Sequence, residues 1–344
     1  MSNPSSSLLQ ISGEAGGGQL LRSSLSLSMV TGHPFRITNI RGKRSKPGLM
    51  RQHLTCVKAA AEVCNAVVDG AELGSMELVF APGKITAGDY AFHIGSGGST
   101  TLVFQTVLPA LLHAERESTL RIEGGTHNPL APPFEFIAEC FLPVLQSFGA
   151  QVSVSLEKHG FMQAGGGMFT ATISPIKKWK KIMLLERGAL ETRFGRVLHA
   201  HLHRDIAERE ITTAAKILDW PKDEFELRYA NDSVGPGNAL LLGARFAQIC
   251  EISTGIAQMG KSAEAVATSA AKGLRSYLAS SAPVGVHLAD QLLLPMAFAG
   301  AGEFQTVAIS NHIQTNMTLI EKFLPVKFEV QDNAQGCKHI RVSA

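Results

Sequence analysis

Gly16-Gly17-Gly18 and Gly95-Ser96-Gly97-Gly98 each open an apolar segment, and this recurrence decides the fold prediction. Their last glycines are 80 positions apart. A second landmark agrees: an amphipathic helix pattern expected to end near Gly70 has a counterpart that ends at Gly149. The sequence therefore predicts two similar α/β units of about 80 residues each.

A third unit is indicated near the C-terminus. Gln105-Thr-Val-Leu-Pro109, inside the second apolar segment, matches Gln291-Leu-Leu-Leu-Pro295 at a distance of 186 positions. This distance exceeds one period by roughly a hundred residues, the size of a small domain. We therefore expect an inserted small domain of residues 185–282 within a large domain made of residues 1–184 and 283–344.

The predicted insert alternates strands and helices. We expect a compact α+β pattern with a strand over 193–203, a helix over 206–218, a strand over 225–229, strands within 239–252 and a helix over 263–278.

The composition is that of a folded globular protein: of 344 residues, 45% are hydrophobic and 18% charged. A net charge of +3 is too small for overall charge to indicate binding to nucleic acid or membranes. Five cysteines without a Cys-x-x-Cys pair favour reduced thiols over a disulfide framework or a zinc ribbon. Residues 1–14 lack the pattern of a secretory signal, and no apolar run reaches about 20 residues. We expect a cytoplasmic protein.

One stretch is locally very basic. Residues 36–53 contain no acidic residue and six basic ones, Arg36, Arg41, Lys43, Arg44, Lys46 and Arg51. Guanidinium groups and amides at a helix start suit phosphate oxygens, although a solvated basic loop explains the pattern equally well. The glycine-rich loops likewise fit either close approach to phosphates or tight turns.

Two motifs in the insert have weaker functional readings. Residues 255–262 satisfy the Walker A pattern but lack a preceding buried strand and an acidic partner, so a nucleotide-binding P-loop is disfavoured. His199, His201 and His203 alternate as on one face of a strand and could bind zinc or nickel. Surface histidines are the favoured alternative.

His312 lies where a predicted strand over 305–309 turns into a predicted helix over 313–323. An imidazole at such a turn is open to substrate and can act as a nucleophile. Taken by itself, a polar capping residue is the simpler reading.

Several long motifs together resemble the RNA 3'-terminal phosphate cyclases, in particular the catalytic members from bacteria. The match covers nearly the whole chain and rests on Gly13-Glu14, Gly16-Gly17-Gly18-Gln19-Leu-Leu-Arg22, Lys46-Pro47-Gly48-Leu-Met-Arg51-Gln52-His53, Gly124-Gly125-Thr126, Ala164-Gly165-Gly166-Gly167, Ala207-Glu208-Arg209-Glu210, Leu288-Ala289-Asp290-Gln291 and His312-x-x-Thr315-Asn316.

The resemblance implies a large domain of three βαβαββ units, similar to those of enolpyruvyl transferases, with a small thioredoxin-like α+β domain inserted in the third. It implies an enzyme of the ligase class that converts an RNA 3'-phosphate to a 2',3'-cyclic phosphate, using ATP and Mg²⁺ or Mn²⁺. The implied partners are ATP and RNA with a 3'-phosphate end. No association with a membrane is implied, and a homo-oligomer is one option for the assembly. The alternative is a non-catalytic cyclase-like protein of ribosome assembly, a class that lacks the nucleophilic histidine.

The resemblance also implies roles for individual residues. His312 would form a covalent histidine-AMP, and AMP would then pass to the RNA 3'-phosphate. Phosphate or RNA groups would bind Arg22, Arg41, Arg44 and Gln52, and Glu14 would hold the metal. The nucleotide would contact Gln105, Pro132, His287, Leu288, Asp290 and Gln291. Asp290 could hold either the other nitrogen of the imidazole or a nucleotide hydroxyl.

The chain departs from the family pattern at a few positions. His287 stands where similar bacterial members are expected to have tyrosine, so stacking on adenine would use a smaller ring. Met162-Gln163 replaces a more usual Tyr-Pro, and His127 stands where aspartate is common. We expect these changes to affect substrate preference rather than the reaction.

Overall fold

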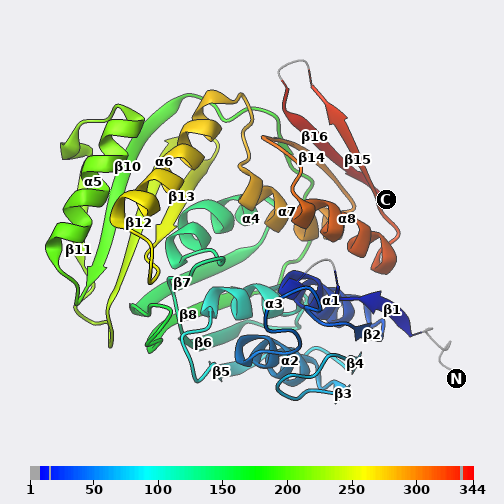
Figure 1. Ribbon diagram of the computed structural model, residues 1–344. Coiled ribbons are helices and arrows are strands. Elements are labelled where there is room, and N and C mark those ends of the chain that lie inside the picture. The colour runs from blue at the N-terminus through cyan, green and yellow to red at the C-terminus, as the bar shows by residue number, and fades with distance from the viewer. Residues whose placement is uncertain (1–7, 15–16, 334–335) are drawn as a thin grey trace, which may run out of the picture.

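The computed structural model describes residues 8–14, 17–333 and 336–344. Gly16 of the first glycine loop, and half of the N-terminal segment inspected for a secretory signal, lie outside these residues. The described chain is a mixed α/β protein with four mixed sheets of four strands each, which confirms the predicted fold class (Figure 1).

The first sheet has the strand order β1-β2-β4-β3. Strands β1 and β2 are parallel and the other pairs antiparallel. Its elements follow the chain in the order β1 (Leu9–Ser12), α1 (Gly17–Thr31), β2 (Phe35–Thr38), α2 (Arg51–Cys64), β3 (Val67–Asp69) and β4 (Leu78–Ala81).

The second sheet has the equivalent order β5-β6-β8-β7, again with one parallel pair, β5 and β6. Its second helix begins as a π-helical segment, η1, which continues directly into α4. The elements are β5 (Asp89–His93), α3 (Thr100–Leu112), β6 (Ser118–Gly124), η1 (Phe136–Phe141), α4 (Leu142–Ser147), β7 (Gln151–Lys158) and β8 (Gly167–Ser174).

The third sheet has the order β15-β16-β14-β9, with β9 and β14 parallel. The chain connects its strands as in the other two, except that a long segment separates β9 from the first helix. The elements are β9 (Met183–Leu184), α7 (Val286–Ala299), β14 (Ala301–Thr306), α8 (Asn311–Phe323), β15 (Lys327–Asp332) and β16 (Lys338–Ser343).

The intervening segment forms the fourth sheet, ordered β11-β10-β12-β13, with α5 and α6 packed against each other beside it (Figure 1). The elements are β10 (Leu190–Ala200), α5 (Arg204–Leu218), the 3₁₀ turn η2 (Lys222–Glu224), β11 (Phe225–Tyr229), β12 (Gly237–Phe246), β13 (Cys250–Ile256) and α6 (Ala263–Ala279). The sequence repeat, the likeness to thioredoxin and the domain boundaries at residues 184 and 282 stay predictions.

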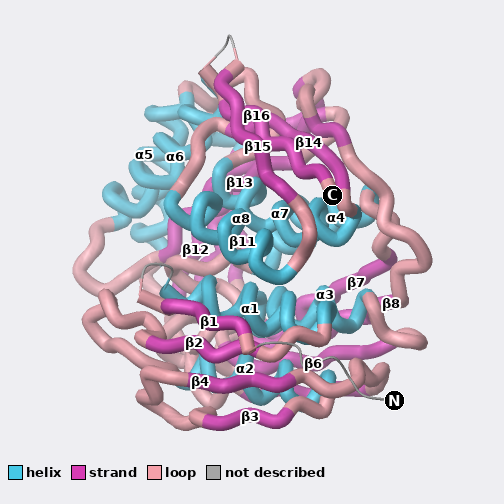
Figure 2. The backbone as a smooth tube through the Cα atoms, turned by 90° about the vertical axis from the view of Figure 1, so that its right-hand side faces the viewer, coloured by secondary structure: helices cyan, strands magenta, loops and turns pink. Residues whose placement is uncertain are grey.

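Apolar helices from all three units meet in the middle of the molecule. In Figure 2, α1 and α3 lie above the first sheet, and α7 and α8 lie above these helices. Helix α3 is buried along nearly its whole length, and α1 contacts both α3 and α8. The buried Ser26 of α1 donates a hydrogen bond to the Thr106 carbonyl of α3 (2.8 Å), so a polar group in this packed region keeps a partner.

One predicted helix boundary is wrong. The helix expected to end near Gly70 ends at Cys64, because Asn65 adopts a left-handed conformation (φ 49°) and its N–H bonds to the Ala61 carbonyl. The following residues form the short strand β3 instead of further helical turns.

The arrangement expected for the three alternating histidines is also wrong. Strand β10 ends at Ala200, and His201 has a left-handed backbone (φ 50°), so the side chains do not share one strand face. His199 bonds the Leu202 carbonyl, His201 bonds the Ser233 carbonyl, and His203 caps α5. Among the described residues, no group of three or more His, Cys, Asp or Glu side chains is placed to hold a metal ion.

The Walker-like run lies in a different structure from a P-loop. Its first residues end β13, which is an edge strand antiparallel to its only neighbour in the sheet, β12. Lys261 is exposed in the following turn, and Ser262 caps α6 by accepting a hydrogen bond from the Ala265 N–H (3.2 Å).

None of the helices in the described part of the chain is long and apolar enough to cross a bilayer.

Side chains with guanidinium or carboxyl groups connect the fourth sheet to the rest of the molecule. Arg196 of β10 and Arg245 of β12 both bond the carboxylate of Glu139 in η1. Glu251 of β13 is buried beside Gly285, the residue that precedes α7, and a Cβ at position 285 would lie 2.2 Å from Glu251 Oε1. Only glycine allows this approach.

Burial raises the pKa of Glu251 to about 8, with a further contribution from nearby Cys250. The folded protein therefore binds a proton that an unfolded glutamate, with a pKa near 4.5, releases. Between these two pH values the folded state holds more protons, so this carboxyl group lowers the stability as pH rises through the window.

We predict that Glu251→Gln removes this pH dependence, because the amide keeps an acceptor oxygen but does not ionise. The free energy of unfolding of the variant relative to wild type should rise by about 2–4 kcal/mol from pH 5 to pH 8, as measured by urea denaturation. Glu62→Gln, which changes an exposed glutamate of α2, is the control. The prediction would be contradicted if the free energies of unfolding of wild type and Glu251→Gln changed in parallel between pH 5 and pH 8.

Candidate active site

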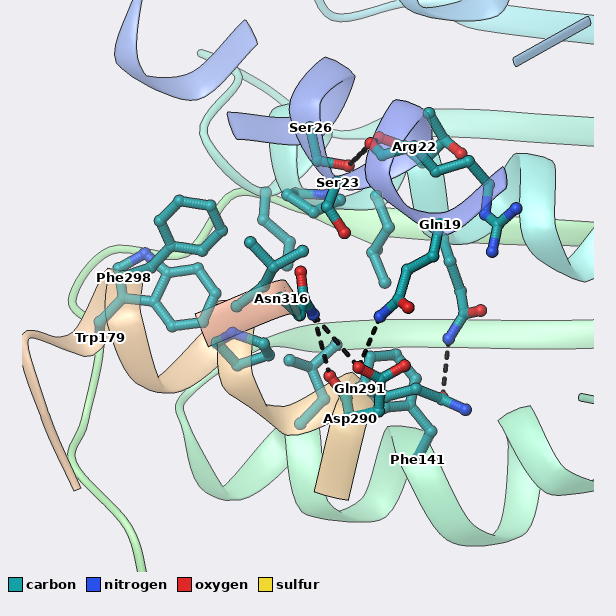
Figure 3. A pocket seen from close by; sticks show the side chains of 18 residues that line it. Gln19, Arg22, Ser23, Ser26, Phe141, Trp179, Asp290, Gln291, Phe298 and Asn316 are labelled. Atoms are coloured by element: carbon teal, nitrogen blue, oxygen red, sulfur yellow. Dashed lines mark hydrogen bonds between the residues drawn. The ribbon is translucent and has the colours of Figure 1, made fainter. Parts of the chain in front are cut away.

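A pocket opens where α1, α3 and α7 meet, next to α8 (Figure 3). One end is polar and includes Gln19, Arg22, Gln105, Asp290, Gln291 and Asn316. Trp179 and Phe298 lie together at the opposite, apolar end, whereas Phe141 lies on the side of Asp290 and Gln291 (Figure 3). Four of the residues predicted to bind nucleotide or phosphate therefore line one pocket.

Gln105 and Gln291, the two matching glutamines of the sequence repeat, are in direct contact. The Gln105 amide nitrogen donates to the Gln291 side-chain oxygen (2.7 Å), which joins α3 to α7 (Figure 3). The hydrogen bond orients both amides at the polar end of the pocket.

His312 lies in the first turn of α8. The helix begins at Asn311, after Ser310 caps it by accepting a hydrogen bond from the Ile313 N–H (3.2 Å). The preceding strand β14 ends at Thr306, so His312 is already helical and not in the turn before the helix as predicted. Its side chain is exposed.

A hydrogen-bonded chain connects His312 to Asp290. His312 Nδ1 bonds Gln19 Oε1, and Gln19 Nε2 donates to Asp290 Oδ1 (2.6 Å). The sequence left open whether Asp290 would hold the imidazole or a nucleotide hydroxyl; in the structure Gln19 stands between Asp290 and the ring. Burial raises the pKa of Asp290, and the Gln19 hydrogen bond is the largest influence opposing that shift.

The other residues predicted to bind the nucleotide, His287, Pro132 and Leu288, are not among the residues that line the pocket. His287 is in the first turn of α7; desolvation lowers its pKa, Asp290 opposes the shift and His312 adds to it. The Pro132 carbonyl accepts a hydrogen bond from the Thr101 hydroxyl (2.7 Å). Leu288 is fully buried, so its side chain belongs to the core.

Three arginines from the predicted phosphate set gather on the side of α1. Burial lowers the pKa of Arg22, opposed by Cys56 and Asp290. Arg41 donates to the Gly48 carbonyl (2.9 Å), and burial and the charge of Arg44 lower its pKa. Arg44 lies over Gly17, where a Cβ would be 3.0 Å from its Nη2. These guanidinium groups form a site of positive potential at the start of α1.

The other basic residues of the stretch have different roles. Arg36 pairs with Glu77 (2.5 Å), and Lys43 lies 3.5 Å from the carboxylate of Glu14. Arg51 donates to the Gly95 carbonyl (2.9 Å). Acidic residues outside the stretch therefore neutralise part of its charge. Arg41 and Arg44 are the basic residues of the stretch that lie with Arg22 at the start of α1.

Gln52 connects the first unit to the second glycine loop. Its side-chain oxygen accepts a hydrogen bond from the Ser99 N–H (2.7 Å), and Ser99 caps α3. Gln52 therefore positions the start of α3, which carries Gln105.

His53 is a site residue to which the sequence analysis assigned no role. Burial lowers its pKa to about 3, with contributions from Arg22 and then Arg41, so the ring is neutral at pH 7. Its Nδ1 has no hydrogen-bond partner among the described residues. Its place in the motif Lys46–His53 was the available signal. Gln19 and Asn316 likewise belong to motifs shared with the family, and neither was predicted to have a role in the site.

Comparison with known proteins places the chain in a family. A family described as RNA 3'-terminal phosphate cyclase matches residues 13–330. A protein of this name from Koribacter versatilis is 48% identical over 328 residues, covering 95% of this chain and 92% of its own length. One from Pseudomonas aeruginosa is 52% identical over 320 residues, covering 93% of this chain and 94% of its own.

A relative of the same name from Pseudomonas fluorescens is 49% identical and covers 98% of both chains. A solved structure of EPSP synthase from Acinetobacter baumannii aligns with 99% of this chain and 66% of its own, at 12% identity and a TM-score of 0.29. The matches to the family and to its named members span nearly the whole sequence and the pocket motifs within it. The chain belongs to the RNA 3'-terminal phosphate cyclase family.

Proposed function

We propose that this protein converts an RNA 3'-terminal phosphate to a 2',3'-cyclic phosphate at the expense of ATP, through a covalent AMP on His312. The observation that carries the proposal is the position of His312. Its ring is exposed at the start of α8 and is held at Nδ1 by Gln19, next to the pocket that contains Arg22 and Asp290. The relatives named RNA 3'-terminal phosphate cyclase support the substrate and the reaction.

The reaction has three transfers. His312 Nε2 attacks the α-phosphorus of ATP, an N–P bond forms, the bond to the bridging oxygen breaks and pyrophosphate leaves. An oxygen of the RNA 3'-phosphate then attacks the same phosphorus and displaces the histidine. Finally the 2'-hydroxyl loses its proton and attacks the RNA phosphorus, the ring closes and AMP leaves. Holding these groups in line supplies much of the rate enhancement.

The arginines would stabilise the charge of the phosphates. Arginine side chains are not deprotonated in proteins, so Arg22, Arg41 and Arg44 bring positive charge to this site. They would neutralise the triphosphate and the RNA 3'-phosphate. Gln52 would act with them, from a position fixed by its hydrogen bond with the Ser99 N–H at the start of α3.

Glu14 is the residue that would hold Mg²⁺ or Mn²⁺. It is an exposed carboxylate directly after β1, and its ion pair with Lys43 is loose enough (3.5 Å) to be exchanged for a metal. Mg²⁺ is usually held by one or two carboxylates together with substrate phosphates and water, so a single glutamate fits this role. When bound, the ion would neutralise charge on the triphosphate.

The adenosine would lie at the polar end of the pocket. Gln105 and Gln291 present oriented amides there, and the His287 and Pro132 rings would enclose the base. Leu288 would contribute through its backbone, because its side chain is buried. We place the reaction in the cytoplasm, in keeping with five cysteines that are all free thiols.

The alternative of a non-catalytic, cyclase-like ribosome-assembly protein is less favoured. Proteins of that class lack the nucleophilic histidine, whereas His312 is present here and is held by Gln19.

We predict that His312→Asn abolishes covalent labelling by ATP that is radioactive at the α-phosphate, because asparagine has no nucleophilic nitrogen. Labelling of wild type, in the presence of Mg²⁺, should be visible on a denaturing gel. His33→Asn changes an exposed histidine after α1 and serves as the control. Label that persists in the His312→Asn chain would mean that another residue carries the AMP.

We also predict that Arg22→Ala slows adenylylation by about 100-fold, the loss typical of removing one stabilising donor from a reacting phosphate. The rate is measured by single-turnover labelling, with thermal unfolding as the check that the variant is folded. Arg36→Ala is the matched control, because it removes an exposed arginine that pairs with Glu77, the residue before β4. Equal losses in the two variants would show that the effect is not specific to the phosphate site.

A further inference from the structure

We propose that Gln19 is a positioning residue that fixes His312 in the tautomer with the hydrogen on Nδ1, and so leaves the lone pair of Nε2 free to attack. The inference deepens the proposed function and rests on it, since it concerns the same nucleophile. It assigns a specific task to a residue of α1 and to Asp290.

The geometry consists of two consecutive hydrogen bonds. Gln19 is only 8% exposed and extends from α1 between α7 and α8. Its Nε2 donates to Asp290 Oδ1 (2.6 Å), and its Oε1 bonds His312 Nδ1 (Figure 3 shows the Gln19–Asp290 contact). Both polar ends of the amide are therefore engaged.

Asp290 determines which way the amide points. A carboxylate oxygen only accepts, so the NH₂ group of Gln19 must face it. Asn316 Nδ2 also donates to Asp290 Oδ1 (3.4 Å). Oδ1 is therefore an acceptor whether or not Asp290 Oδ2 carries a proton. The opposite orientation of the amide would place two acceptor oxygens against each other.

The orientation of Gln19 in turn determines the tautomer of His312. With its NH₂ group on Asp290, Gln19 presents its carbonyl oxygen to the imidazole, and that oxygen can only accept. Nδ1 must therefore carry the hydrogen. A neutral imidazole has one hydrogen, so Nε2 keeps its lone pair and is the nucleophilic nitrogen.

This arrangement also suits the return of the histidine to its starting state. When Nε2 bonds to phosphorus, the ring becomes cationic while Nδ1 keeps its hydrogen, and Gln19 accepts a stronger hydrogen bond from it. When AMP passes to RNA, the N–P bond breaks and the electron pair returns to Nε2. The ring therefore takes and releases AMP without gaining or losing a proton.

The test reads the tautomer directly. In full-length protein with ¹⁵N-labelled histidine, long-range ¹H–¹⁵N spectra distinguish the two neutral tautomers, and His312→Asn identifies the signal. We expect the Nδ1–H form in wild type and a shift to mainly Nε2–H in Gln19→Leu. Adenylylation by Gln19→Leu should fall about 10- to 100-fold in kcat, with little change in the KM for ATP.

A double variant provides the rescue. Gln19→Glu places an acceptor on Nδ1–H, and Asp290→Asn supplies an amide that donates to the new carboxylate. The hydrogen bond between positions 19 and 290 is then reversed in direction, but each contact still has one donor and one acceptor. We expect this pair to recover the Nδ1–H signal and to label faster than either single variant. Gln151→Leu, an exposed glutamine at the start of β7, is the control for the substitution itself.

The outcomes separate this inference from the proposed function. An Nε2–H tautomer in wild type would overturn the inference even if AMP is attached to His312. An Nδ1–H tautomer in a wild-type protein that never takes label would support the positioning by Gln19 and count against the proposed reaction. The wild-type spectrum decides the tautomer even where a variant fails to fold.

Discussion

The packing of α1 against α3 and α8, with α7 packed on α8, is the constraint on which the rest of the structure depends. These helices follow strands of three different sheets, and each carries side chains that line the same pocket. Because their contacts are largely buried, the polar groups between them must pair with one another. The Gln105–Gln291 and Ser26–Thr106 hydrogen bonds meet this requirement. An unpaired group in such a place would cost about 1–3 kcal/mol, so the packing and the polar site are specified together.

Much of the secondary structure could be predicted from periodicity and breakers. Strand β11 has the predicted bounds, 225–229, and α6 differs from its prediction by one residue at its end. The errors arose at single residues with left-handed backbones. Asn65 ends α2 early, and His201 ends the alternation of β10. Hydrophobic patterns do not encode such local backbone conformations, since Asn and His occur in helices and strands as well.

The candidate site was predictable where its members share a local pattern. The run of basic residues indicated either a phosphate site or a solvated loop, and the family resemblance implied the binding roles of Arg41, Arg44, Gln105 and Gln291. Contacts between distant residues left no such pattern. Gln19 and Asp290 are 271 positions apart, and their hydrogen bond follows only from the packing of α1 and α7 against α8. The pairing of Arg36 with Glu77 was hidden in the same way, because the two strands that bring them together are separated by a helix and another strand.

The contact between Glu251 and Gly285 limits how the molecule can be rebuilt. The fourth sheet looks like a separate module, yet one of its strands places a carboxyl group against the start of the helix that carries His287, Asp290 and Gln291. Replacing this sheet by an unrelated domain would leave the first turn of α7 without its neighbour. The new domain would have to present a surface that packs closely against Gly285 and a polar group for the N–H groups at the start of α7. The fourth sheet and α7 should therefore be exchanged, in evolution or in design, as one piece.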